Sequence, residues 1–206
     1  MRLPASIRSA LLALAAVLLA STAARAALPD GVRETSYVLS SGERVLELAI
    51  DVPANAHDVW GALATSAGYQ SWAAPVAHVD FRVGGAIETS YNPKAVVGAK
   101  TNIRNLILAI VPERAFVIRN LQAPGKTTFD APTFQKTQTA VVLTPLDEQR
   151  TRVTLINSGY SAGALWDGVY DFFRTGNAWS LTSLRDRFAK GPTDWSKAQV
   201  PGGDVR

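Results

Sequence analysis

The stretch GALWDGVYDFFRTGNAWSLTSLRDRFAK, residues 163–190, decides the fold. Its large side chains recur in steps of three and four residues, which is the spacing of one buried helical face. The series runs Trp166, Tyr170, Phe173, Asn177, Leu181, Leu184 and Phe188. Gly191-Pro192 follows it and predicts the end of the helix. At about 1.5 Å per residue the helix would be roughly 40 Å long, enough to cross a whole sheet.

The chain before this helix alternates apolar and polar residues with a period of two, as half-buried strands do. On residues 44–52, one face would carry Leu46, Leu48, Ile50 and Val52. Turns such as Gly84-Gly85 join consecutive strands by connections that are too short for parallel crossovers. We therefore expect an α+β protein, with a curved antiparallel sheet of about six to seven strands around the long C-terminal helix.

The N-terminus has the pattern of a secretory signal peptide spanning residues 1–26. Arg2 and Arg8 flank the start of a Leu-, Ala- and Val-rich run, and Ala24-Arg25-Ala26 supplies a small-x-small cleavage pattern. The apolar run is shorter than the roughly 20 residues that a membrane span needs. We expect cleavage after Ala26, export to the periplasm or the extracellular space, and no membrane span afterwards. An uncleaved anchor is the alternative.

The composition excludes several classes of protein. The 206 residues include 21 Lys and Arg, 17 Asp and Glu, and no cysteine. Three of the basic residues belong to the signal, and no basic run remains that could follow nucleic-acid phosphates. The absence of cysteine excludes a thiol nucleophile and a thiolate metal site. We expect residues 27–192 to form one domain and the polar residues 193–206 to form a flexible C-terminal tail.

Six short motifs, in this order of elements, resemble the SRPBCC superfamily, which includes the START domains and the birch-pollen-allergen fold. The motifs are Val59-Trp60, Trp72-Ala73-Ala74-Pro75, Val83-Gly84-Gly85, Ile110-Val111-Pro112-Glu113-Arg114, Thr151-Arg152-Val153-Thr154 and Phe173-Arg174-Thr175-Gly176-Asn177-Ala178-Trp179. The chain is most similar to the bacterial branch that resembles the C-terminal domain of the activator of the heat-shock-90 ATPase. The resemblance covers nearly all of residues 44–192 and implies a helix-grip fold with a cavity for a hydrophobic ligand. We expect no cofactor.

The expected cavity would lie between the sheet and the helix, against residues 170–181. Its expected ligand-binding residues are Trp72, Tyr91, Phe116, Trp166, Tyr170, Phe173, Asn177 and Leu181. Asn177 is polar in the middle of an apolar stripe, and Gly176 beside it weakens a helix by roughly 1 kcal/mol. Both features suit a helix that holds a ligand. The alternative is that Asn177 bonds to a strand and Gly176 permits close packing.

Candidates for catalysis are few. Glu88 and Arg104 each lie on an expected strand, and a buried carboxylate could act as general acid or base. Exposure to solvent is the alternative for both, and alternation places Glu88 on the face opposite to Tyr91. His57 and His78 are the only histidines, and they lack the spacing of metal ligands, so we expect no metal site.

Residues 159–163, Gly-Tyr-Ser-Ala-Gly, fit the G-x-S-x-G nucleophile elbow of the α/β hydrolases. In that fold the catalytic histidine follows the serine, whereas both histidines here precede Ser161. A small-residue turn before the helix is the favoured interpretation.

The expected function is an exported binder or carrier of a small hydrophobic molecule. The alternatives are a cyclase- or aromatase-type enzyme that uses the same cavity, and a protein-interaction module.

Overall fold

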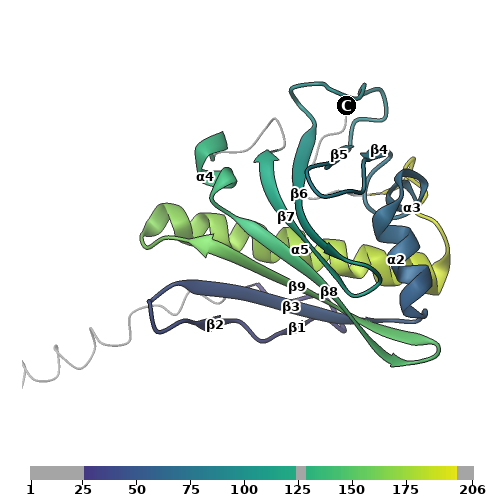
Figure 1. The fold of residues 1–206 in the computed structure, drawn as a ribbon, viewed down its shortest axis with the longest axis horizontal. Coiled ribbons are helices and arrows are strands. Elements are labelled where there is room, and N and C mark those ends of the chain that lie inside the picture. The colour runs from purple at the N-terminus through teal and green to yellow at the C-terminus, as the bar shows by residue number, and fades with distance from the viewer. Residues whose placement is uncertain (1–25, 124–128, 199–206) are drawn as a thin grey trace, which may run out of the picture.

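The computed structural model describes residues 26–123 and 129–198, and the expected signal peptide falls almost wholly outside them. The described residues form one antiparallel sheet with helices packed on it (Figure 1). The strands are β1 (Arg33–Glu34), β2 (Tyr37–Val38), β3 (Arg44–Val52), β4 (Val76–Val79), β5 (Ala86–Ser90), β6 (Ile103–Val111), β7 (Ala115–Gln122), β8 (Gln138–Asp147) and β9 (Arg150–Tyr160). The helices are α2 (Ala56–Ala64), α3 (Ser66–Gln70), α4 (Ala131–Gln135) and α5 (Ala164–Lys190).

The expected fold class is confirmed. The strand order is β1-β3-β9-β8-β7-β6-β5-β4, with β2 also paired to β3, and every pairing is antiparallel. Of the nine strands in the described residues, β1 and β2 have two residues each. The other seven strands match the expected six to seven.

Helix α5 runs across one face of the curved sheet (Figure 1) and covers 27 residues, as its periodicity predicts. It buries Trp166, Val169, Tyr170, Phe173, Ala178, Leu181 and Leu184. Burial of each large apolar side chain contributes about 1.5–3 kcal/mol to stability, which holds the helix on the sheet. Gly191 ends the helix at a φ of 95°, and its N–H donates to the carbonyl of Arg187 at 3.1 Å.

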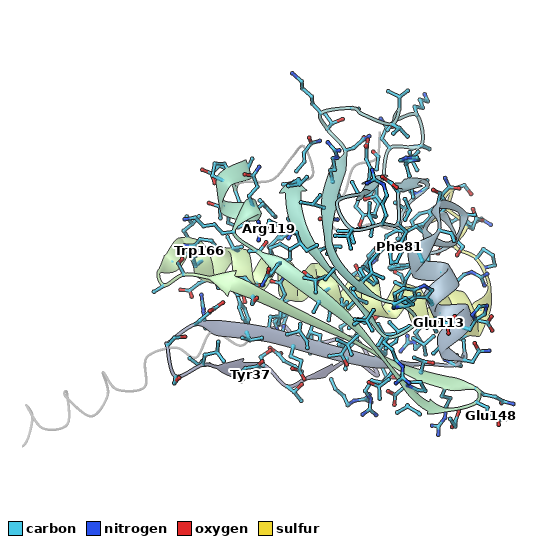
Figure 2. All side chains as sticks on the ribbon, in the orientation of Figure 1. Tyr37, Phe81, Glu113, Arg119, Glu148 and Trp166 are labelled. Atoms are coloured by element: carbon cyan, nitrogen blue, oxygen red, sulfur yellow. The ribbon has the colours of Figure 1, made fainter. Side chains whose placement is uncertain are left out.

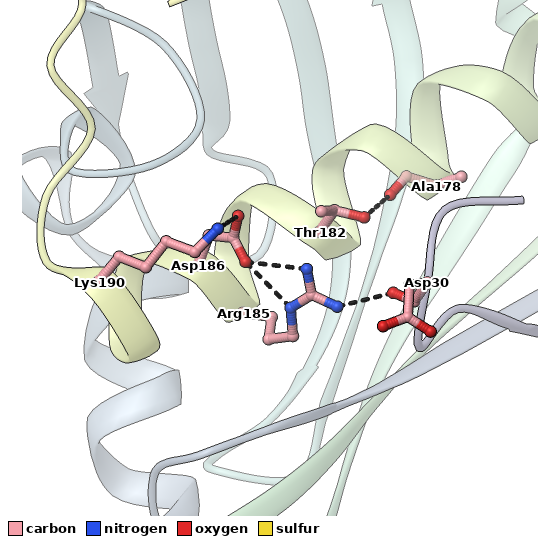
Figure 3. A network of polar contacts seen from close by, with 6 residues as sticks. All are labelled: Asp30, Ala178, Thr182, Arg185, Asp186 and Lys190. Atoms are coloured by element: carbon pink, nitrogen blue, oxygen red, sulfur yellow. Dashed lines mark hydrogen bonds and ion pairs between the residues drawn. The ribbon is translucent and has the colours of Figure 1, made fainter.

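The segment before β3 is tied to α5 by charged side chains. Arg185 Nη1 donates to the carbonyl of Asp30 at 2.7 Å, and its other nitrogens donate to Asp186 (Figure 3). About three turns nearer the start of the helix, Arg174 Nε donates to Glu34 Oε2 at 2.9 Å. These contacts fix β1 and the residues before it against α5.

The start of the C-terminal tail also makes contacts. The N–H of Thr193 donates to the carbonyl of Ser71 at 2.9 Å, and Trp195 Nε1 donates to the carbonyl of Gln70 at 2.7 Å. The sequence predicts that the flexible tail begins at residue 193. In the structure, residues 193–198 contact the end of α3 through these two bonds. Residues 199–206 lie outside the described residues.

Candidate functional site

A cavity of about 190 Å³ lies between α5 and the inner face of the sheet. Five consecutive strands each line it with two residues that are two positions apart, because alternate side chains of a strand share a face. These pairs are Thr89 and Tyr91 at the end of β5, Ile103 and Asn105 on β6, Ile118 and Asn120 on β7, Thr139 and Val141 on β8, and Val153 and Leu155 on β9. The sheet wall is therefore a patch of aliphatic, hydroxyl and amide side chains.

Helices supply the remaining walls. From α5 come Phe173, Asn177, Trp179, Ser180, Leu181 and Leu184, and from the α2–α3 region come Leu63, Tyr69, Trp72 and Ala73. The aromatic rings hold one another in place. Trp179 meets Tyr91 edge to face at 5.9 Å between ring centroids, and Tyr69 lies 5.1 Å from Trp72. Trp72 is fixed further, since its Nε1 donates to the carbonyl of Ala62 at 2.9 Å.

The lining is electrically neutral. Among the described residues that line the cavity, none is an acid, a base or a histidine, and the two titratable groups are the phenols of Tyr69 and Tyr91. Burial raises the pKa of Tyr91 to about 12, and burial raises the pKa of Tyr69 further. Both phenols are therefore protonated at neutral pH and offer hydrogen-bond donors without charge.

Two of the polar lining residues are already engaged. Asn120 Nδ2 donates to Thr137 Oγ1 at 2.8 Å, and Thr139 Oγ1 accepts from Asn157 Nδ2 at 2.6 Å. These bonds link β7 and β9 to the segment at the start of β8. They hold the polar side of the sheet wall in one arrangement.

Asn105 and Asn177 differ from them. Asn105 Oδ1 on β6 and Asn177 Nδ2 on α5 are buried, and neither atom has a hydrogen-bond partner among the described residues. A buried polar group without a partner costs about 1–3 kcal/mol. No bond from Asn177 Nδ2 to a strand accounts for its place. Close packing against other elements does not account for Gly176 either, because no described atom beyond its chain neighbours and the adjacent backbone of α5 lies within 4 Å of where its Cβ would stand.

The structure divides the expected ligand-binding residues into two groups. The residues that line the cavity are Trp72, Tyr91, Phe173, Asn177 and Leu181. Outside its lining lie Phe116, Trp166 and Tyr170, all of which are buried in the core.

The three residues outside the lining pack at the two ends of the core. Phe116 meets Phe81 at 5.2 Å between ring centroids, near α2, whereas Tyr170 meets Tyr160 at 5.1 Å. Figure 2 shows Phe81 and Trp166 at opposite ends of the molecule. The apolar stripe of α5 is buried at Trp166, Tyr170, Phe173, Leu181 and Leu184, but the cavity adjoins the helix only from Phe173 onward.

Neither Glu88 nor Arg104 lines the cavity. They are directly opposite each other on β5 and β6, so their side chains share a face of the sheet. That is the outer face, because Thr89 and Ile103, their chain neighbours, face the cavity. Glu88 is buried there by the β5–β6 loop, and Arg104 is exposed. The structure places both candidate catalytic groups away from the cavity.

The serine motif and the histidines do not form a catalytic group. Ser161 is exposed, and Tyr160 before it is buried with its hydroxyl bonded to Asn157. His57 Nδ1 lies 2.6 Å from Glu113 Oε1, in the turn between β6 and β7. Within residues 26–123 and 129–198, no three side chains of the types that bind metals lie close enough together to hold an ion.

A second depression, of about 520 Å³, lies outside the sheet against α2, α3 and the end of α5. Its wall includes Asp58, Ser71 and Arg187. The Arg187 guanidinium is already engaged there, since its Nε donates to Ser71 Oγ at 2.9 Å. The cavity inside the sheet is the better candidate for an apolar ligand, because aliphatic and aromatic side chains surround it.

The helix-grip class of proteins is defined by a curved sheet that surrounds a long C-terminal helix, with a cavity between the two. The model of the family described as Activator of Hsp90 ATPase homolog 1-like protein matches residues 53–189, and the chain belongs to this family. A search of curated proteins gave no match.

Two solved structures show the same fold at low sequence identity. The Aha1 dimer from Colwellia psychrerythraea aligns with a TM-score of 0.54 and 17% identity, over 71% of this chain and 97% of that chain. CalU16 from Micromonospora echinospora aligns with a TM-score of 0.52 and 17% identity, over 80% of this chain and 88% of that chain. The expected relationship to the SRPBCC superfamily, on its Hsp90-activator side, is confirmed.

Among the lining residues that the sequence argument missed, Asn105 is the one with a buried polar atom that has no partner among the described residues. It stands between Ile103 and Ile107, which share its face of β6 at a period of two. The signal in the sequence was a polar residue on the otherwise apolar, inward-facing side of a central strand. The same signal, at helical spacing, singled out Asn177.

Proposed function

We propose that this chain binds a small hydrophobic molecule in the cavity between α5 and the sheet, and carries it without transforming it. The observation that carries the proposal is the lining, which combines aliphatic and aromatic side chains from five strands and three helical segments with a few neutral polar groups. Protein sites for small molecules typically have this composition. The fold of the family is compatible with such a role.

The enzymatic alternative, a cyclase or aromatase, has less support. General acid–base catalysis needs a group that gains or loses a proton near the working pH. Glu88 and Arg104 lie off the cavity, and the phenols of Tyr69 and Tyr91 keep their protons well above neutral pH. Convergent neutral groups of this kind orient a ligand.

We also propose that the chain acts after export. The support is the pattern of residues 1–26, a short apolar run with a small-x-small cleavage site. In the described residues, no helix is both long enough and apolar enough to cross a membrane. Export would separate the chain from a cytosolic chaperone ATPase, so we do not extend the activator role in the family description to it.

Export can be tested by fractionation of a bacterial host and mass spectrometry of the exported chain. We expect a mature N-terminus at Ala27, and we expect Ala24→Arg to leave the precursor uncleaved. An unprocessed chain that stays in the cytoplasm would contradict the proposal and would reopen the protein-interaction alternative.

Binding can be tested by isothermal titration calorimetry with toluene, a small apolar ring. Phe173→Asp places a carboxylate in the apolar wall and should abolish binding, because burying an unpaired charge is very costly. Leu165→Asp is the matched control, since Leu165 lies on the same helix, is 53% exposed and is outside the lining. It should bind toluene as the wild type does.

Ala73→Leu provides a second test if Phe173→Asp does not fold. It adds an apolar side chain inside the lining without adding charge and should weaken toluene binding by filling the cavity. Equal toluene affinity in the wild type and in folded Ala73→Leu would place the site elsewhere. The absence of any apolar adduct on the exported protein in native mass spectrometry, together with no toluene binding, would overturn the carrier role.

A further inference from the structure

We infer that the ligand is a neutral, single-ring molecule with one group that both donates and accepts a hydrogen bond, held between Asn105 and Asn177. This inference rests on the binding function proposed above. It adds the size, the charge and the anchoring group of the ligand. A hydroxyl or a primary carboxamide on the ring fits this description.

Size follows from the volume of the cavity. Sites for drug-sized ligands typically measure about 300–1,000 Å³, and an engineered cavity of about 150 Å³ binds benzene. The cavity here is about 190 Å³, close to the smaller case. It therefore matches one six-membered ring with a small substituent.

Charge follows from the lining. Among the described residues around the cavity there is no acid, base or histidine, and both phenols are protonated. A carboxylate or an ammonium group would lose its hydration without meeting an opposite charge, which strongly disfavours its entry. The lining thus selects neutral ligands.

The anchor follows from the two unpartnered atoms. Asn105 Oδ1 accepts hydrogen bonds and Asn177 Nδ2 donates them, and both side chains line the same cavity from opposite walls. A ligand group with one donor and one acceptor would satisfy both atoms. The other amide in the lining, Asn120, already donates to Thr137 and is not part of the anchor.

The test compares benzamide, toluene and benzoate on the wild-type protein by isothermal titration calorimetry. A neutral hydrogen bond contributes about 0.5–1.5 kcal/mol, so two bonds correspond to roughly 5- to 150-fold in affinity. We expect benzamide to bind at least about fivefold more tightly than toluene. Benzoate should show no measurable binding.

Substitution separates the anchor from a structural role of the two amides. In N105L and N177L, the preference for benzamide over toluene should fall by up to about tenfold, because one hydrogen bond to benzamide is lost. The unliganded variants should unfold at a higher temperature than the wild type, since each replaces an unpartnered polar group by an apolar one. N120L, the matched control, should unfold at a lower temperature, because it breaks the bond to Thr137.

The outcomes distinguish this inference from the binding function beneath it. Equal affinities for toluene and benzamide, unchanged in N105L and N177L, would overturn the anchor and leave apolar binding intact. Benzoate binding as tight as that of benzamide would overturn the neutral ligand. Binding of neither toluene nor benzamide would overturn both the inference and the proposed function.

Discussion

Glu88 Oε1 accepts two hydrogen bonds, from Asn102 Nδ2 and from the N–H of Gly98, both at 2.6 Å. Asn102 Nδ2 also donates to the carbonyl of Val96, and Gln122 Nε2 on β7 donates to the carbonyl of Asn102. One carboxylate on the outer face of β5 therefore holds the second half of the β5–β6 loop, residues 96–102. This contact gives the best candidate for an acid–base group a structural role.

We expect Glu88→Ala to lower the free energy of unfolding by about 2 kcal/mol, because the buried amide of Asn102 and the part-buried N–H of Gly98 lose their shared acceptor. Arg104→Ala, opposite it on the same face but exposed, should change it by less than about 0.5 kcal/mol. Urea denaturation of both variants and of Asn102→Ala measures this. A double-mutant cycle between Glu88 and Asn102 should give a coupling of about 0.5–3 kcal/mol, and a coupling of zero would contradict the loop anchor.

In the Gly-Tyr-Ser-Ala-Gly motif, we expect the first glycine to matter for stability and the serine not to. Gly159 has a φ of 98°, and a Cβ there would stand 2.1 Å from the carbonyl oxygen of Lys136. Gly159→Ala should therefore cost at least about 2 kcal/mol of stability, from strain and backbone displacement. Ser161→Ala should leave stability within about 0.5 kcal/mol, because Ser161 is exposed. Thermal denaturation compares them, and a large loss of stability in Ser161→Ala would contradict the interpretation of Ser161 as part of an exposed turn.

Several parts of the fold could be predicted because local signals agree there. The periodicity of residues 163–190 and the Gly191-Pro192 stop locate α5 almost to the residue, and short turns exclude parallel crossovers. Helix α4 shows where such signals fail. Pro132 suggests a loop, but proline is tolerated in the first turn of a helix, and Asp130 caps this one by accepting from the N–H of Thr133.

The candidate site was only partly predictable, for a different reason. Helical spacing shows that Trp166 and Phe173 are both buried, but not which of them adjoins a cavity. The position of the cavity depends on how the sheet curves along the helix, and this curvature cannot be predicted from the pattern of neighbouring residues. The alternation of residues on β6 can be read from the sequence, and it places Asn105 on the same face as Ile103 and Ile107.

The stability of the protein should depend on pH through His57. The hydrogen bond from His57 to Glu113, and then their Coulombic attraction, hold the pKa of His57 above its ordinary value of 6.5. A raised pKa means that this contact contributes fully below about pH 6.5 and is lost as pH rises through the raised pKa. NMR titration should give a pKa above 6.5 for His57 in the wild type and a lower one in Glu113→Gln. Equal pKa values in the two proteins would contradict the pairing.

Leu184 is one of the α5 residues that bound the cavity from the helix side. It is only 2% exposed and lies in the lining, one helical turn beyond Leu181. Leu184→Ala should cost about 2–5 kcal/mol of stability, because a buried leucine leaves a larger cavity behind. It should also let the protein bind a two-ring molecule such as naphthalene, which we expect the wild type to exclude.

Leu165→Ala is the control on the same helix. Leu165 is 53% exposed and outside the lining, so its truncation should change stability by less than about 0.5 kcal/mol and leave ligand size unchanged. Calorimetry with naphthalene on the wild type and both variants measures the size limit, and thermal unfolding measures the stability. If folded Leu184→Ala binds naphthalene no better than Leu165→Ala does, the ligand does not lie against this part of α5. Gain of binding in Leu184→Ala alone would place it there, because enlarging a cavity improves affinity only for a molecule that occupies it.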